Sequence, residues 1–214
     1  MQVHEIPEHL RPKNEKISFF KDGNSLLEKL SRTPIQVPYM ILLPIIAYAM
    51  YRGIVVYGEG IISMLAMFFG GVLFWTFFEY FAHRYFFHME PNNAFKKKFQ
   101  LILHGLHHQQ PTDPGRLVMS PVGSVSIYAL TYALFYFTAG AKGIGFQSGF
   151  AFGYLAYLFV HYITHMWKKP NNIFGNLWRF HHLHHYKYPN HVFGVSSPLW
   201  DYIFGTMPPK EDKQ

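Results

Sequence analysis

The stretch IISMLAMFFGGVLFWTFFEYFA, Ile61 to Ala82, decides the fold class. A helix needs about 20 mostly apolar residues to cross the hydrocarbon core of a bilayer. Glu79 is the only charged residue in this stretch. Over the whole chain, 50% of the residues are hydrophobic, 19% are aromatic and only 14% are charged. The charged share is below the roughly 25% of soluble domains, so the sequence predicts an integral membrane protein.

Three shorter apolar stretches accompany it: IQVPYMILLPIIAYAMY (35–51) and segments near 122–137 and 144–160. They lie at or slightly below the lower length limit of a span, so we expect short helices or locally thinned lipid. Short turns with glycine, at 52–60 and 139–145, join the stretches in pairs. This arrangement predicts an all-α protein with four transmembrane helices in two hairpins. The alternative, buried core helices of a soluble protein, does not explain the pairing.

The positive charge predicts the orientation of the spans. The formal net charge is +7, and of the 19 Lys and Arg residues only Arg52 and Lys142 lie in the two turns. The other 17 lie in regions that four spans place on one side, and positive residues near spans mark the cytoplasmic side. The basic excess is thus explained by topology and indicates no nucleic-acid partner. The N-terminus lacks the pattern of a cleaved secretion signal.

We therefore expect three parts. Residues 1–34 form a cytosolic N-terminal segment, residues 35–208 a membrane domain, and residues 209–214 a tail. Within the membrane domain, residues 83–121 and 161–208 form a helical cytosolic cap. A bacterial inner membrane and an endoplasmic reticulum membrane both fit this layout.

Twelve of the 14 histidines lie between His83 and His191, at the cytoplasmic ends of spans or in cytoplasmic segments. Positions i, i+3 and i+4 share one face of a helix, so several of these rings project together. His83 and His88 diverge by roughly 140° at about 100° per residue. That pair works only if the helix ends or bulges between them, or if each ring approaches from a different side. The four groups are HRYFFH (His83, His88), HGLHH (His104, His107, His108), HYITH (His161, His165) and HHLHH (His181, His184, His185).

These ten imidazoles predict a metal centre with two ions. There is no cysteine, which excludes thiolate ligands and disulfides. Imidazole suits Zn, Cu, Fe and Ni, and ten rings fit two ions with about five each, leaving a position for water, oxygen or substrate. The alternatives are a solvated histidine-rich loop, a pH switch, bis-histidine haem, a divalent metal transporter and a non-catalytic scaffold stapled by metal. We leave out His4, His9, His182 and His191.

The chain resembles the membrane-bound fatty acid hydroxylase superfamily, and within it the fatty acid 2-hydroxylases. The superfamily pattern H-x3-4-H, H-x2-3-H-H, H-x3-H, H-x2-3-H-H is present in order. The likeness covers roughly residues 34–208. More specific similarity lies in these stretches: WTFFEYFAHRYFFH (Trp75–His88), LILHGLHHQQPTDPGRLVMSP (Leu101–Pro121), GYLAYLFVHYITH (Gly153–His165) and FGVSSPLWDYIFGT (Phe193–Thr206).

The resemblance implies a lipid monooxygenase that hydroxylates a long acyl chain beside its carbonyl, in a fatty acid or a sphingolipid. The ten histidines named above become its metal ligands, with iron as the active metal and zinc able to occupy the sites. Oxygen is the co-substrate. The first 34 residues lack the cytochrome b5 domain of many relatives, so a separate electron donor of cytochrome b5 or ferredoxin type is expected. The runner-up is a desaturase, or a hydroxylase of another lipid or carbon.

Several further residues have two interpretations. Glu79 shares a helix face with His83 and is expected either to accept the second N–H of that ring or to pair with Arg84 or a lysine. Tyr157, with Tyr162, lines the site or belongs to the interfacial aromatic belt. Asp113 is expected to shape a turn. Relatives often have Asp where this chain has Leu158. The run Lys96–Lys98 is expected to touch anionic headgroups, or to dock an acidic electron donor.

Overall fold

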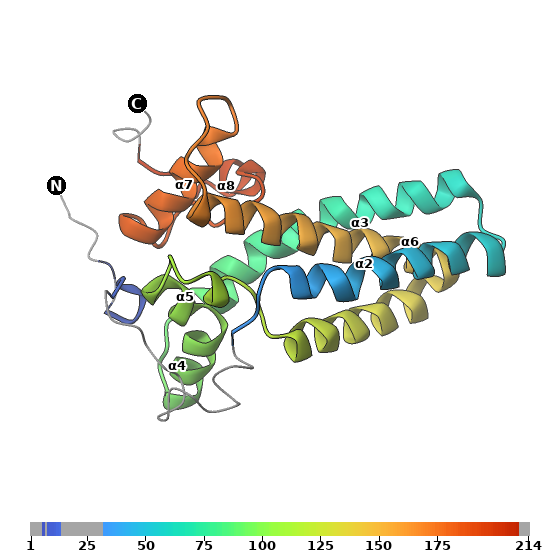
Figure 1. The fold of residues 1–214 in the computed structure, drawn as a ribbon, viewed down its shortest axis with the longest axis horizontal. Helices are drawn as coiled ribbons and strands as arrows, with labels where there is room; N and C mark the ends of the chain where they lie inside the picture. Colours follow the sequence, from blue (N-terminus) through green and yellow to red (C-terminus); the bar gives the residue numbers. More distant parts are fainter. Residues whose placement is uncertain (1–5, 7, 14–31, 210–214) are drawn as a thin grey trace.

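The computed structural model describes residues 6, 8–13 and 32–209, and every regular element in these residues is helical. Three long helices form one end of the molecule and short helices form the other end, which we call the cap (Figure 1). The long helices are α2 (Gln36–Tyr51), α3 (Ile61–Ala82) and α6 (Pro121–Met166). The cap contains α4 (Ala94–Gln100), α5 (Leu106–Gln109), α7 (Gly175–Tyr186) and α8 (Leu199–Ile203). Further short elements are η1 (Glu8–Leu10), η2 (Arg52–Val56), η3 (His83–Phe87), η4 (Leu101–Gly105) and η5 (Pro114–Arg116).

Helix α6 reverses direction at Gly140, where φ is 59° and ψ is −138°. This backbone region is open to glycine because glycine has no Cβ. The two arms then run side by side: the rings of Phe135 and Phe146 lie 4.9 Å apart, and Gln147 Nε2 donates to the carbonyl of Tyr128. The turn expected over 139–145 is thus concentrated at one residue, and the expected third and fourth stretches are the two arms of one helical hairpin.

The second arm of α6 packs closely on α3 through glycines spaced four residues apart. Gly145, Gly149 and Gly153 share one face of the arm. A Cβ on Gly149 would lie 1.8 Å from the carbonyl oxygen of Phe68, and one on Gly71 of α3 would lie 2.0 Å from that of Phe146. Small residues at this spacing let helix backbones approach closely, which is the usual basis of helix association in membranes.

This contact gives a prediction with a control one residue away. We expect Gly71→Ala to lower the free energy of unfolding by about 1–3 kcal/mol, because the added methyl forces the two backbones apart. Gly70→Ala should change little, since its Cβ would meet only the ring of Phe146, at 3.7 Å. The thermal midpoints of both variants, measured in detergent, test this. Equal midpoints would contradict the close packing.

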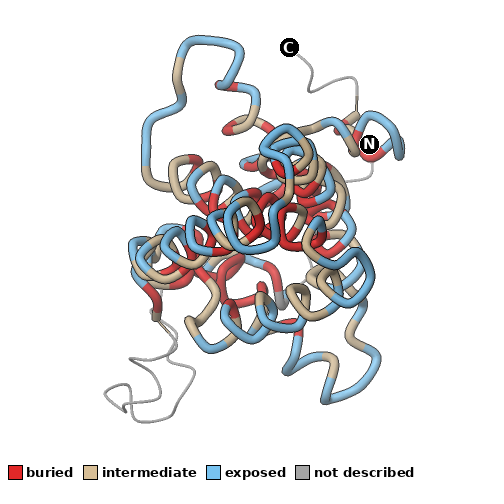
Figure 2. The backbone as a smooth tube through the Cα atoms, turned by 90° about the vertical axis from the view of Figure 1, so that its right-hand side faces the viewer, coloured by how far each residue is buried: buried red, intermediate tan, exposed pale blue. Residues whose placement is uncertain are grey.

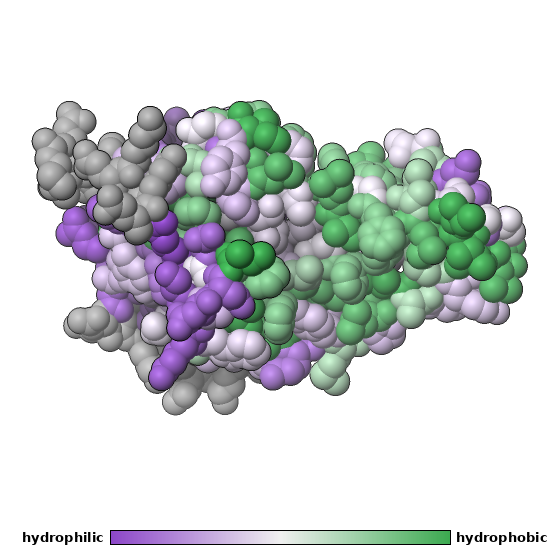
Figure 3. Space-filling view, turned by 90° about the horizontal axis from the view of Figure 1, so that it is seen from above, coloured by the Kyte–Doolittle hydropathy of each residue, from purple (hydrophilic) through white to green (hydrophobic). Residues whose placement is uncertain are grey.

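The long helices are apolar on their outer faces. Among the described residues, three helical stretches are long and apolar enough to cross a membrane: Gln36–Val56, Ile61–Phe87 and Pro114–Met166, the last of which includes the reversal. Ile62 and Phe137 are 85% and 84% exposed. Hydrophobic side chains predominate along the bundle away from the cap, with a few hydrophilic ones at its tip, whereas hydrophilic side chains gather on the cap (Figure 3). Viewed along the bundle, the buried residues lie at its centre (Figure 2). The outer surface therefore fits lipid, as the composition predicted.

Candidate metal centre

The ten predicted histidines come together where the long helices meet the cap. They form two groups of five, and within each group one nitrogen from every ring lies within 4.8 Å of the others. Ring stacking joins the groups, since His108 and His185 lie 4.0 Å apart, centroid to centroid. Site A consists of His83, His88, His104, His108 and His184; site B consists of His107, His161, His165, His181 and His185.

The spacing of the nitrogens within each site fits one metal ion. In site A, Nε2 of His104 lies 3.0 Å from that of His83 and 2.9 Å from that of His108. In site B, Nε2 of His107 lies 2.9 Å from that of His161 and 3.0 Å from that of His185. With metal–nitrogen bonds of about 2.1 Å, ligands at right angles lie about 3.0 Å apart. The donor sets present therefore match two ions, each held by five imidazoles.

In two of the site A rings, hydrogen bonds identify which nitrogen keeps a lone pair for a metal ion. Nδ1 of His83 lies 2.5 Å from the carbonyl oxygen of Phe193, and Nδ1 of His184 lies 2.8 Å from that of His191. A carbonyl oxygen can only accept, so these rings donate from Nδ1 and keep a lone pair on Nε2. Such a bond to the second nitrogen is the usual way to orient a metal-binding histidine. His191, left out as a ligand, contributes its backbone here.

The local electrostatics keep the rings neutral. Burial lowers the pKa of six cap histidines well below the usual value, and repulsion between neighbouring rings lowers it further. Neutral rings retain the lone pairs that a metal ion needs. The six are His104, His107, His108, His181, His184 and His185.

A π-helix brings His83 and His88 into the same site. The wide turn η3 separates them, and the N–H of His88 bonds to the carbonyl of His83, five residues back. A π-turn holds more residues than an α-helical turn, so residues i and i+5 diverge less than in an α-helix, and such turns are frequent at functional sites. The sequence required the helix to end or bulge between the two histidines, or the rings to approach from different sides. The structure has the bulge.

The triple-histidine motifs divide between the two sites. His104 and His108 belong to site A, whereas His107 belongs to site B. In α7, His181 and His185 belong to site B and His184 to site A. Each motif thus contributes its i and i+4 rings to one site and its i+3 ring to the other. His182 of the same helix is exposed, in line with its omission.

The expected contact between Glu79 and the His83 ring is not made. Glu79 accepts the backbone N–H groups of Val195 and Ser196, at 2.6 and 2.9 Å, and the hydroxyl of Ser196. Arg84, the other suggested partner, donates to the hydroxyl of Tyr80 instead. The Glu79 carboxylate therefore accepts hydrogen bonds from the backbone just after Phe193. The carbonyl of Phe193 in turn orients the ring of His83.

A second buried carboxylate, from α8, holds the same segment and was not singled out from the sequence. Asp201 accepts the N–H groups of Phe193 and Gly194, at 2.9 and 2.8 Å, and the hydroxyl of Thr206, at 2.7 Å. Burial raises the pKa of the Asp201 carboxyl, and these hydrogen bonds oppose the rise. We call residues 191–196 the strap. The only sequence signal for its role was the C-terminal stretch that resembles the 2-hydroxylases.

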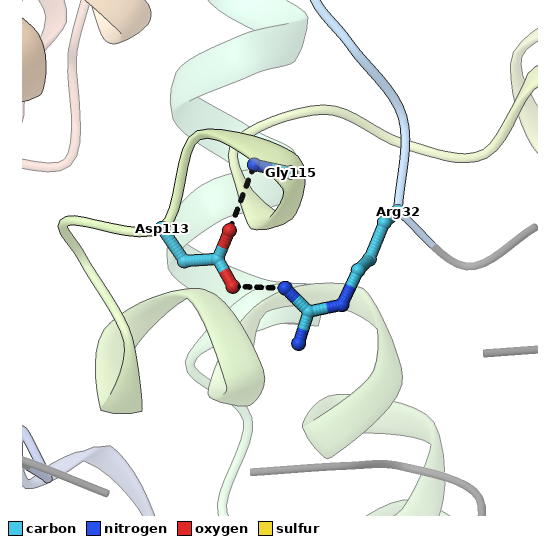
Figure 4. A network of polar contacts seen from close by, with 3 residues as sticks. All are labelled: Arg32, Asp113 and Gly115. Atoms are coloured by element: carbon cyan, nitrogen blue, oxygen red, sulfur yellow. Dashed lines mark hydrogen bonds and ion pairs between the residues drawn. The ribbon is translucent and has the colours of Figure 1, made fainter. Parts of the chain in front are cut away.

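Other residues singled out from the sequence fall around the centre. Tyr157 stacks on the ring of His161, with centroids 5.4 Å apart, so it lies beside site B. Leu158 is buried in the core between α2 and α6. Tyr162 packs against that same core. Asp113 shapes a turn as expected: it accepts the N–H of Gly115 at 3.0 Å and pairs with Arg32 (Figure 4).

The lysines of α4 lie on the cap, where Lys97 and Lys98 are exposed beside the exposed rings of Phe95 and Phe99. His4 and the side chain of His9 lie outside the described residues.

A cavity of about 800 Å³ lies between α3 and the two arms of α6 and reaches histidines of both site A and site B. Its walls are mostly apolar and include Trp75, Phe78 and Phe150. Cavities that bind small molecules commonly measure about 300–1,000 Å³ and are lined by apolar side chains with a few polar groups. Four histidines line the end near the cap: His83, His104, His107 and His161.

Comparison with known proteins agrees with this architecture. Residues 68–206 match the family described as fatty acid hydroxylase. The chain is 37% identical to a mouse fatty acid 2-hydroxylase over 69% of its length and 41% of the relative. It is 31% identical to an Arabidopsis thaliana dihydroceramide fatty acyl 2-hydroxylase over 85% of its length and 76% of the relative. The solved structure of full-length scs7p, with only the hydroxylase domain visible, matches 89% of this chain and 72% of that chain, at a TM-score of 0.81 and 31% identity. The chain belongs to the fatty acid hydroxylase family.

Proposed function

We propose that this protein hydroxylates a long acyl chain, in a fatty acid or a sphingolipid, at the carbon beside the carbonyl, using oxygen. The observation that carries the proposal is the apolar cavity that ends on histidines of both sites. Hydroxylation of a C–H bond by oxygen is an oxidation that side-chain acids and bases cannot carry out, so the hard chemistry belongs to a cofactor and the protein supplies placement. The relatives named as fatty acid and dihydroceramide fatty acyl 2-hydroxylases support this assignment.

The ten histidines of sites A and B are the proposed ligands of two iron ions, which zinc can replace. These two metal ions, when bound, would supply the oxygen activation that C–H cleavage requires. The residues of this chain do the rest. Trp75, Phe78 and Phe150 hold the acyl chain and exclude water, and Arg116, in the same cavity wall, offers a positive charge to the acyl head. Tyr157 braces the ring of His161. The strap aims His83 and His184.

We place the domain over residues 35–208, with α2, α3 and the two arms of α6 as four membrane crossings. The cap then lies on the cytosolic side, because Arg52 and Lys142 are the only basic residues in the two turns at the opposite end. The protein is a multi-pass protein of the bacterial inner membrane or the endoplasmic reticulum. Electrons come from a separate protein of cytochrome b5 or ferredoxin type.

Lipid mass spectrometry of a host that expresses the chain tests the function. We expect acyl lipids that are one oxygen heavier, with fragmentation placing the hydroxyl beside the carbonyl. The His165→Ala variant, which lacks one site B ring, should give none of this product. A loss of two hydrogens would identify a desaturase instead. Unchanged lipids in cells whose purified protein holds two metals per chain would overturn the proposal in favour of a scaffold.

A further inference from the structure

The outer face of α7 borders a surface pocket of about 580 Å³, which we call the basic pocket. Its walls come from the helix and from one lysine on each side of it: Lys169, Arg179, His182, Leu183, Tyr186 and Lys187. The four helical members follow the spacing i, i+3, i+4 and i+7, which places them on one face. Both lysines are exposed. The sequence has no Asp or Glu between Asp113 and Asp201, so this part of the chain supplies no carboxylate to offset the positive charge.

The opposite face of α7 carries three of the rings in the metal centre: His181, His184 and His185. Tyr186 connects the two faces, because it is 48% exposed and its ring also contacts the centre. Its centroid lies 6.0 Å from that of His182 in the basic pocket and 6.0 Å from that of His185 in site B. The basic pocket is therefore separated from a site B ring by a single aromatic side chain.

We propose that the basic pocket docks a small acidic protein that carries a one-electron redox centre, an inference that rests on the proposed function. Hydroxylation of one C–H bond by O2 places one oxygen atom in the product and the other in water, and it consumes two electrons and two protons. A one-electron carrier must therefore dock and leave twice in each turnover. Electron-transfer complexes are among the smallest and weakest protein–protein contacts, and opposite charges speed their formation. A basic surface beside the centre meets both requirements.

The lysines of α4 form another basic group on the cap and were the site first considered for such a donor. Lys97 and Lys98 lie beside the exposed rings of Phe95 and Phe99. Lysines together with exposed apolar rings are typical of helices that lie on a lipid surface. Helix α4 also carries none of the ten histidines. Its lysines therefore suit anionic headgroups, and they offer a control with matched charge.

Binding of the soluble haem domain of cytochrome b5, used as the probe, tests the docking site. The titration uses the oxidised probe and the metal-loaded full chain in neutral detergent, so it needs no turnover. Lys169→Glu/Lys187→Glu should weaken binding by about tenfold, because each change replaces attraction with repulsion. Added salt should weaken binding by the wild type. Lys97→Glu/Lys98→Glu makes the same change in charge on α4 and should bind as the wild type does. Arg179 is left unchanged because one of its guanidinium nitrogens is buried.

The outcomes separate this inference from the proposed function. Weaker binding in Lys169→Glu/Lys187→Glu alone supports the docking site even if no lipid is hydroxylated. Equal weakening in both double variants, weakening only in the α4 variant, or no change in either overturns it, even if hydroxylation is normal. A wild type that does not bind the probe, or binds it without salt dependence, overturns it as well. Should the glutamate variant fail to fold, Lys169→Gln/Lys187→Gln removes the same two charges and should weaken binding by a smaller factor.

Discussion

His181→Ala is expected to reduce bound metal from two ions per chain to about one and to lower the hydroxylation rate by more than 100-fold. His181 is a member of site B, and its Nε2 lies 2.7 Å from that of His165. Changes to groups that only orient metal ligands already cost about 10–100-fold in metal affinity or activity, so removal of a ligand should cost more. Elemental analysis of the purified protein, together with product formation, measures both effects.

The adjacent histidine provides the control for this variant. His182 lies on the same helix but is exposed and belongs to neither site. His182→Ala should keep both ions and most of the activity. If the two variants lose metal equally, or if neither does, the division of α7 into ligand and non-ligand faces is wrong.

Asp201→Ala is expected to lower both stability and the metal affinity of site A. The change leaves the N–H groups of Phe193 and Gly194 buried without their acceptor, at a cost of about 1–3 kcal/mol each. The carbonyl of Phe193 then no longer holds His83, so site A should bind its ion about 10–100-fold more weakly. Site B, which contains neither His83 nor His184, should change less.

Metal titrations and thermal midpoints of Asp201→Ala and Asp201→Asn test this prediction. Asparagine keeps one acceptor oxygen, so the thermal midpoint and the site A metal affinity of Asp201→Asn should both lie between those of the wild type and of Asp201→Ala. A fall in stability with unchanged affinity of both sites would show that the strap supports the fold without aiming the rings.

The sequence was sufficient to predict a helical protein with apolar helices of membrane-spanning length, and two groups of about five histidines that come together. Apolar helices and shared helix faces follow from local periodicity, and the repeated layout of the histidine motifs indicated that the groups meet. The sequence did not predict how the rings divide, since that depends on where neighbouring helices lie: His104 and His107 share a helix face yet belong to different sites. Helix-face reasoning placed Glu79 beside His83 in the chain. It did not anticipate that the backbone of Val195, more than a hundred residues away, would occupy its carboxylate.

The glycines of the second α6 arm show the same limit. Gly145, Gly149 and Gly153 could be read as flexible positions or as a packing face, and only the position of α3 distinguishes the two. The chain likewise reverses direction at a single residue, Gly140, where the sequence suggested a turn over residues 139–145.

Val192 has a backbone φ of 52°, which a β-branched residue rarely adopts. The residues on either side of Val192 supply the two carbonyls that orient the rings. The carbonyl of His191 accepts from His184, and the carbonyl of Phe193 accepts from His83. Such a conformation costs about 1–3 kcal/mol and persists only where the surroundings enforce it; here the valine is 1% exposed and its N–H bonds to Thr206. The strained backbone of Val192 thus lies between the two carbonyls that orient His184 and His83. Glycine adopts this φ without strain, so we expect Val192→Gly to make this backbone more flexible and the positions of both rings less fixed.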